Sequence, residues 1–124
     1  DESARIDEPA ELLARRLAMT KANRVLTHNP SSLVIGSDQV ADLGGRLLGK
    51  PLDRDRAFEQ LCACSGRTVY FYTALAVVSV ASEQVDCVTT EVRFRNLTRR
   101  QIESYIKKEE PLDCAGSFKC EGLG

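Results

Sequence analysis

The spacing of apolar residues predicts helices and strands along the whole chain. From Pro9 to about Leu26, apolar side chains recur three or four positions apart, which is typical of an amphipathic helix. Pro9 suits the first helical position, where a missing N–H costs no hydrogen bond. The expected apolar stripe consists of Leu13, Ala14, Leu17, Ala18, Ala22 and Val25.

The next apolar run, Leu-Val-Ile at 33–35, predicts a buried strand that ends at Gly36. Asp38 would then follow the carboxyl end of a strand, where ligands collect in sheets that carry helices on their faces. Residues 40–48 predict a hairpin whose turn is Gly44-Gly45. The pattern therefore marks Asp38 as a candidate for chemistry.

Two further helices are predicted from their capping residues. Asp53 is expected to cap a helix that runs to about Ala63, with an inward face of Phe58, Leu61 and Cys62. Thr98 and Gln101 have the spacing of a capping box, which opens a helix to about Lys108.

Two long strands are predicted between these helices. Residues 68–80 are rich in β-branched and aromatic side chains, and residues 88–95 alternate polar and apolar positions after a turn at Ser82-Glu83. Because no repeat or low-complexity stretch interrupts the pattern, helices and strands are expected to share one domain over residues 1–124.

Composition excludes several classes of protein. The 124 residues are 43% apolar and 28% charged, with a net charge of −1, which is typical of a folded globular domain. The sequence contains no run of about 18 apolar residues, so it predicts no membrane-spanning helix. Balanced charge gives no support for bulk electrostatic binding, so neither nucleic acid nor a membrane is an expected partner.

The cysteines favour a reducing compartment. They number five and form no C-x-x-C pair, so we expect free thiols, mostly buried, in a cytoplasmic protein. A zinc site is not expected, because the single imidazole, His28, lies far from them in sequence. The five are Cys62, Cys64, Cys87, Cys114 and Cys120.

Polar clusters outside the periodic elements fit phosphate chemistry. Asp1-Glu2, Ser37-Asp38-Gln39 with Lys50, and Ser117-Lys119-Glu121 combine carboxylates, which hold hard divalent cations, with lysines, which neutralise phosphates. Each cluster is also compatible with a solvated loop. Lys21 has two readings as well: its stem covers the edge of the apolar stripe while its ammonium meets water, or the ammonium points at an anion.

Several motifs, in order and spacing, resemble the Maf family of nucleoside triphosphate pyrophosphatases across essentially the whole chain. They are Gly36-Ser37-Asp38-Gln39-Val40, Gly49-Lys50-Pro51-Leu52, Phe71-Tyr72-Thr73-Ala74-Leu75 and residues 114–122. The resemblance implies an α/β protein of three α/β/α layers with a long mixed sheet, similar to the inosine triphosphate pyrophosphatases. It also implies hydrolysis between the α- and β-phosphates of a nucleoside triphosphate, with Mg²⁺ or Mn²⁺.

The resemblance carries roles to matching positions. Asp38 corresponds to the residue that accepts a proton from water, and Glu2 to an acid that joins Asp38 at the metal. Ser117 and three lysines are expected to bind the substrate; the lysines are Lys21, Lys50 and Lys119. Gln39 and Glu121 match the selectors of the base and resemble the subgroup acting on 7-methyl-GTP. A carboxylate such as Glu121 can accept hydrogen bonds from the N1–H and N2–H₂ donors of guanine.

The chain differs from the family pattern at both ends. We expect it to be truncated, since it starts after the family's arginine-rich phosphate loop and stops before the closing strand and helix, so the fragment itself is expected to be inactive if those parts are needed. A missing first strand would leave an exposed sheet edge suited either to aggregation or to pairing with a second copy, as a homodimer. Two rival functions stay open: a non-catalytic nucleotide-binding module linked to cell division, and a stress-related structural domain.

Overall fold

The computed structural model describes residues 4–5 and 7–119, and these fall into two compact units. The first unit holds the described residues up to Val40 together with Phe71–Thr90, and the second holds Ala41–Tyr70 and the residues from Glu91 onward. Three strands contribute residues to both units, because the unit boundaries fall inside them. One domain over residues 1–124 stays a prediction.

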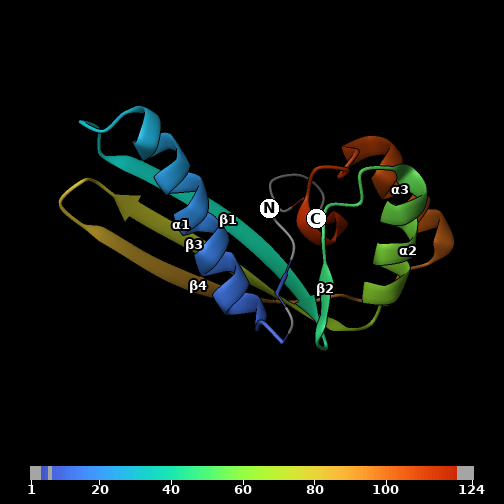
Figure 1. Ribbon diagram of the computed structural model, residues 1–124. Helices are drawn as coiled ribbons and strands as arrows, with labels where there is room; N and C mark the ends of the chain where they lie inside the picture. Colours follow the sequence, from blue (N-terminus) through green and yellow to red (C-terminus); the bar gives the residue numbers. More distant parts are fainter. Residues whose placement is uncertain (1–3, 6, 120–124) are drawn as a thin grey trace. The chain divides into compact units, whose positions relative to one another are not determined.

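The long helix α1 (Ala10–His28) lies along one face of the strands in the first unit (Figure 1). Pro9 is its N-cap, whereas the sequence predicted it as the first helical residue, and the helix ends two residues beyond the predicted position. The predicted stripe is confirmed except for Val25, which is 49% exposed. Val25 lies near the helix end, where residues 29–33 are also exposed, so little of the core reaches it.

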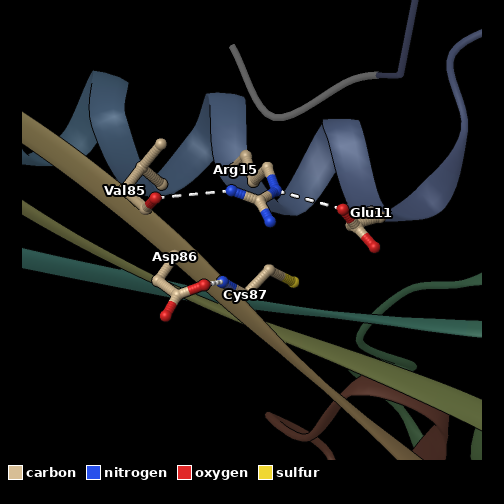
Figure 2. A network of polar contacts seen from close by, with 5 residues as sticks. All are labelled: Glu11, Arg15, Val85, Asp86 and Cys87. Atoms are coloured by element: carbon tan, nitrogen blue, oxygen red, sulfur yellow. Dashed lines mark hydrogen bonds and ion pairs between the residues drawn. The ribbon is translucent and has the colours of Figure 1, made fainter.

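Arg15 connects α1 to β4 (Glu83–Arg93). Its Nε donates to Glu11 Oε2 at 3.1 Å, and its Nη1 donates to the carbonyl oxygen of Val85 at 3.4 Å (Figure 2). Beside this contact, the backbone N–H of Cys87 donates to Asp86 Oδ1 at 2.8 Å. One guanidinium therefore links the helix to a strand within the first unit.

Strand β1 (Val34–Leu43) continues through Gly36, so the prediction that it ends there was wrong. Asp38 is the fifth residue of this ten-residue strand and does not follow its end. Of the apolar run expected to be buried, Ile35 is 66% exposed and Leu33 is exposed as well. Side chains of a strand alternate between faces, and Ile35 points away from the face on which its neighbours Val34 and Gly36 are buried.

The predicted hairpin is confirmed. β1 pairs antiparallel with β2 (Arg46–Leu48), and Leu43 lies opposite Arg46 across the Gly44-Gly45 turn. Both glycines have positive φ, +56° and +93°, which a two-residue hairpin turn of this type requires and which glycine adopts without a steric penalty.

Strands β3 (Thr68–Val78) and β4 complete a four-stranded antiparallel sheet in the order β2-β1-β3-β4 (Figure 1). β3 agrees with the predicted strand at 68–80, whereas β4 begins five residues earlier than predicted. The intervening turn is closed by Ser79 N–H donating to the carbonyl oxygen of Ser82 at 2.8 Å. The exposed polar residues at 83, 84 and 86 concealed the start of β4.

In the second unit, α2 (Arg54–Cys64) packs beside α3 (Arg99–Glu109). Both predicted caps are confirmed: Asp53 Oδ1 accepts from Arg56 N–H at 2.8 Å, and Thr98 forms the capping box with Gln101. The inward face of α2 differs from the prediction, because Cys62 is exposed and Cys64 is buried. The core cluster consists of Ala57, Leu61, Ile102 and Ile106.

The expected α/β class is confirmed. The four strands among the described residues are antiparallel, so any parallel pairing of the mixed sheet implied by the resemblance lies outside them. No helix in the described part of the chain is long and apolar enough to cross a membrane.

Candidate functional site

Gly36 allows α1 to approach β1 closely in the first unit. A Cβ atom at this position would lie 2.6 Å from the Ala18 carbonyl oxygen and 2.8 Å from the Ala22 Cβ, closer than real contacts permit. The absence of a side chain therefore sets the distance between helix and strand. Lys21 lies between Ala18 and Ala22 in the helix, and Asp38 lies two residues after Gly36 on the same strand face.

This close approach brings Lys21 and Asp38 together. Lys21 Nζ donates to Asp38 Oδ1 at 2.8 Å, which makes a charged hydrogen bond. The side chain of Asp38 is 16% exposed and that of Lys21 is 41% exposed, so the pair is reachable from solvent. Of the two readings of Lys21, the ammonium directed at an anion is the observed one, and the anion is the predicted catalytic carboxylate.

Gln39 is held by a neighbouring strand. Its Nε2 donates to Thr73 Oγ1 on β3 at 2.9 Å. Because this contact occupies the NH₂ end of the amide, the carbonyl end is left to accept hydrogen bonds from another group. Thr73 lies in the Phe71–Leu75 motif that resembles the family, but the sequence does not predict the pairing of its hydroxyl with Gln39.

Lys50 and Ser117 lie on two loops of the second unit. Lys50 is exposed and follows Gly49, directly after β2. Ser117 belongs to a short 3₁₀ turn, Ala115–Ser117, and is fully buried with a positive φ of 59°. Its hydroxyl donates to Gln60 Oε1 at 2.7 Å. Gln60 was not among the predicted site residues, although it lies three residues from buried Ala57 and four from buried Cys64 on one helix face.

Lys119 is tied to α3. Its backbone N–H donates to the Tyr105 hydroxyl at 2.7 Å, and its Nζ lies 3.5 Å from the carbonyl oxygen and 3.9 Å from a carboxylate oxygen of Glu109. The ammonium is partly exposed, at 37% for the side chain. Lys119 therefore keeps a solvent-facing charge on a backbone that is fixed by Tyr105.

The predicted site residues fall into two groups. Lys21, Asp38 and Gln39 belong to the first unit, and Lys50, Ser117 and Lys119 belong to the second. Glu2 and Glu121 lie outside the described residues. The individual roles of these eight residues stay predictions.

Asp38 is the described carboxylate that the family resemblance assigns to a metal ion. Residues 4–5 and 7–119 contain no cluster of three or more histidine, cysteine or carboxylate side chains suited to a metal ion. Mg²⁺ is commonly held by one or two carboxylates together with substrate phosphates. Asp38, a partly exposed carboxylate, fits that mode of binding.

Two of the described thiols, Cys64 and Cys87, lack the lowered pKa of a catalytic cysteine. Burial raises the pKa of Cys64 to about 11, against the opposing effect of Arg67 and Arg46. Burial and the nearby Glu11 carboxylate also raise the pKa of Cys87. A nucleophilic cysteine needs a lowered pKa. Cys62, Cys64 and Cys87 are free thiols, as expected, but only Cys64 of these three is buried, so the prediction that the cysteines are mostly buried was wrong. Cys120 lies outside the described residues.

The sequence of this chain is similar to a protein-family model and to several curated proteins. Residues 1–124 match the family model described as Maf-like protein. The chain is 53% identical to a 7-methyl-GTP pyrophosphatase of Pseudomonas savastanoi pv. phaseolicola, 52% to one of Pseudomonas putida and 49% to one of Aliivibrio fischeri. These alignments include the whole chain and 66%, 66% and 65% of the relatives, so the chain spans just under two thirds of their length.

Proposed function

We propose a function from one premise: this chain belongs to the Maf family. The intact protein hydrolyses the anhydride bond between the α- and β-phosphates of 7-methyl-GTP and releases the monophosphate and pyrophosphate. Relatives at 49–53% identity are named for this substrate. The observation in the chain itself that carries the proposal is the Lys21–Asp38 pair, a carboxylate held at 2.8 Å by an ammonium group.

Asp38 acts as the general base. Water adds its oxygen to phosphorus, one of its protons passes to the Asp38 carboxylate, and the anhydride bond breaks as pyrophosphate leaves. Lys21 fixes Asp38 Oδ1, which leaves the second carboxylate oxygen for the water. Lys50 and Lys119 stabilise the charge that develops on the departing pyrophosphate.

Base selection falls to Gln39 and Glu121. The carbonyl end of the Gln39 amide, left over by the Thr73 contact, accepts from a donor on the guanine ring. Glu121 adds a carboxylate that attracts the cationic 7-methylguanine ring. Guanine donors and a positive ring distinguish this substrate from pyrimidine triphosphates.

Asp38 and Glu2 would hold the divalent cation, Mg²⁺ or Mn²⁺, together with the phosphates. When bound, the cation neutralises charge on the phosphate oxygens. Because carboxylate and phosphate oxygens are the ligands that Mg²⁺ prefers, the donor set fits the ion.

The test is pyrophosphate release by the intact protein with Mg²⁺, comparing 7-methyl-GTP with GTP, UTP and dTTP. We expect the highest kcat/KM for 7-methyl-GTP. If no pyrophosphate were released from any of the four nucleotides, the proposed enzymatic activity would be refuted. Calorimetry with a non-hydrolysable analogue then identifies the non-catalytic alternative, which predicts binding without product.

We also propose that the protein is cytoplasmic and forms a homodimer. The free thiols among the described residues support a reducing compartment. Analytical ultracentrifugation of the intact protein tests the dimer, which predicts twice the monomer mass.

A further inference from the structure

The amide of Gln60 contacts two loops of the second unit at once. Its Nε2 donates to the carbonyl oxygen of Gly49 at 2.9 Å, and its Oε1 accepts from Ser117 Oγ at 2.7 Å. Gly49 directly precedes Lys50, and Ser117 lies two residues before Lys119. One helix side chain is therefore bonded to the backbone of one lysine-bearing loop and to a serine side chain of the other.

The loops are also joined directly at the same place. The N–H of Gly116 donates to the Gly49 carbonyl oxygen at 3.3 Å, so this oxygen receives two donors. Gly116 and Ser117 both have positive φ, 66° and 59°. A serine in this conformation is strained and persists when surrounding contacts hold it. The hydrogen bond from the fully buried Ser117 hydroxyl to Gln60 is such a contact.

Gln60 itself is firmly placed. It shares a face of α2 with the buried residues Ala57 and Cys64, and the helix is capped at its start by Asp53. A side chain on a rigid helix positions loop groups more accurately than another loop does.

We propose that Gln60 is a positioning residue, which holds the Gly49–Lys50 and Ser117–Lys119 segments in the arrangement where both lysines meet the phosphates. This inference rests on the proposed function, because it assumes that Lys50 and Lys119 bind phosphate. The rival explanation is that Gln60 contributes to folding alone.

The experiment compares Gln60→Met with wild type in the intact protein. Methionine keeps a side chain of similar length and removes both hydrogen-bonding ends. Gln84→Met is the matched control, because Gln84 is exposed on β4 and its substitution removes no contact described above. kcat and KM for 7-methyl-GTP, the Kd of pyrophosphate from calorimetry, and Tm are measured for each protein.

A positioning role predicts that Gln60→Met lowers kcat/KM roughly 10- to 100-fold, as small misplacements of binding groups do. It also predicts pyrophosphate binding weaker by about tenfold. Gln60→Glu keeps the acceptor for Ser117 but sets a second acceptor against the Gly49 carbonyl oxygen, so it should also lower kcat/KM and weaken pyrophosphate binding. It carries the test if Gln60→Met does not fold. Gln84→Met should match wild type.

Two outcomes separate the two proposals. Wild type that releases no pyrophosphate from 7-methyl-GTP refutes the proposed function. Wild type that turns over, with Gln60→Met unchanged to within about twofold in kcat, KM and pyrophosphate Kd, overturns the positioning role even if Tm falls.

Discussion

Lys21 Nζ lies 2.8 Å from Asp38 Oδ1, and the two side chains come from a helix and a strand that meet without a side chain between them at Gly36. The ion pair is therefore a product of packing as much as of charge. Changes to the helix–strand contact and changes to the carboxylate should be distinguishable, since the first acts on stability and the second on chemistry.

Asp38→Asn should abolish most of the activity while preserving the fold. The amide keeps the shape of the carboxylate and cannot accept a proton from water, so kcat for pyrophosphate release should fall roughly 10²- to 10⁴-fold. Asp86→Asn, on the exposed strand β4, is the control and should keep the wild-type rate. An unchanged rate for Asp38→Asn would assign water activation to another group.

Gly36→Ala should destabilise the protein by about 1–3 kcal/mol, because the new methyl group overlaps the Ala18 carbonyl oxygen. Urea unfolding monitored by circular dichroism measures the change. Gly49→Ala is a matched control, since a Cβ at that position meets nothing within 4 Å and stability should change by less than about 0.5 kcal/mol. Equal stabilities of the two variants would contradict the close contact.

Thr73→Val should loosen base selection. Valine preserves volume and removes the acceptor for Gln39 Nε2, so the amide is free to rotate. One neutral hydrogen bond is worth about 1 kcal/mol, so we expect the kcat/KM ratio of 7-methyl-GTP to UTP to fall about fivefold. Thr90→Val, exposed on β4, should leave the ratio unchanged. If both variants changed the kcat/KM ratio equally, the orientation of Gln39 by Thr73 would not be the cause of base selection.

The Glu8–Arg16 pair should make stability depend on acidic pH. Hydrogen bonds from the Arg16 guanidinium and the Arg5 N–H lower the pKa of Glu8 from about 4.5 to about 2. A carboxyl whose folded pKa is lowered adds stability above its unfolded pKa and loses it as pH falls through the folded value. The contribution should therefore be complete above about pH 5 and disappear towards pH 2.

Thermal unfolding of wild type and Glu8→Gln across pH 2–6 measures this contribution. The difference in Tm should be greatest at the upper end of the range and vanish near the lower end. Glu83→Gln, an exposed carboxylate on β4, serves as control. A pH-independent difference for Glu8→Gln would mean that the carboxylate charge is not responsible.

Local signals predicted much of the secondary structure. The caps at Asp53 and Thr98 and the Gly44-Gly45 turn act through contacts within a few residues, so sequence alone locates them. The predicted end of β1 was wrong, because the length of this strand depends on pairing with strands that are distant in sequence. With that pairing, β1 continues beyond Gly36. Asp38 was thus selected as a candidate with a mistaken placement at a strand end.

Contacts at long range explain what the sequence analysis missed in the candidate site. The inward face of α2 was predicted from its largest apolar residues, whereas the structure buries Ala57 and Cys64, which places Gln60 on the buried side. A polar residue between small buried ones on one helix face was the available signal. The hydrogen-bond partner of Gln39 could not be predicted from the sequence, because Thr73 lies 34 positions away on another strand.

The raised thiol pKa values of Cys64 and Cys87 have a practical consequence. Alkylating reagents and peroxides attack the thiolate, so these two side chains should resist both near neutral pH. Cys62 is exposed on α2, the helix that carries Gln60. A maleimide fluorophore attached there would label the surface of that helix and leave the core cluster of Ala57, Leu61, Ile102 and Ile106 undisturbed.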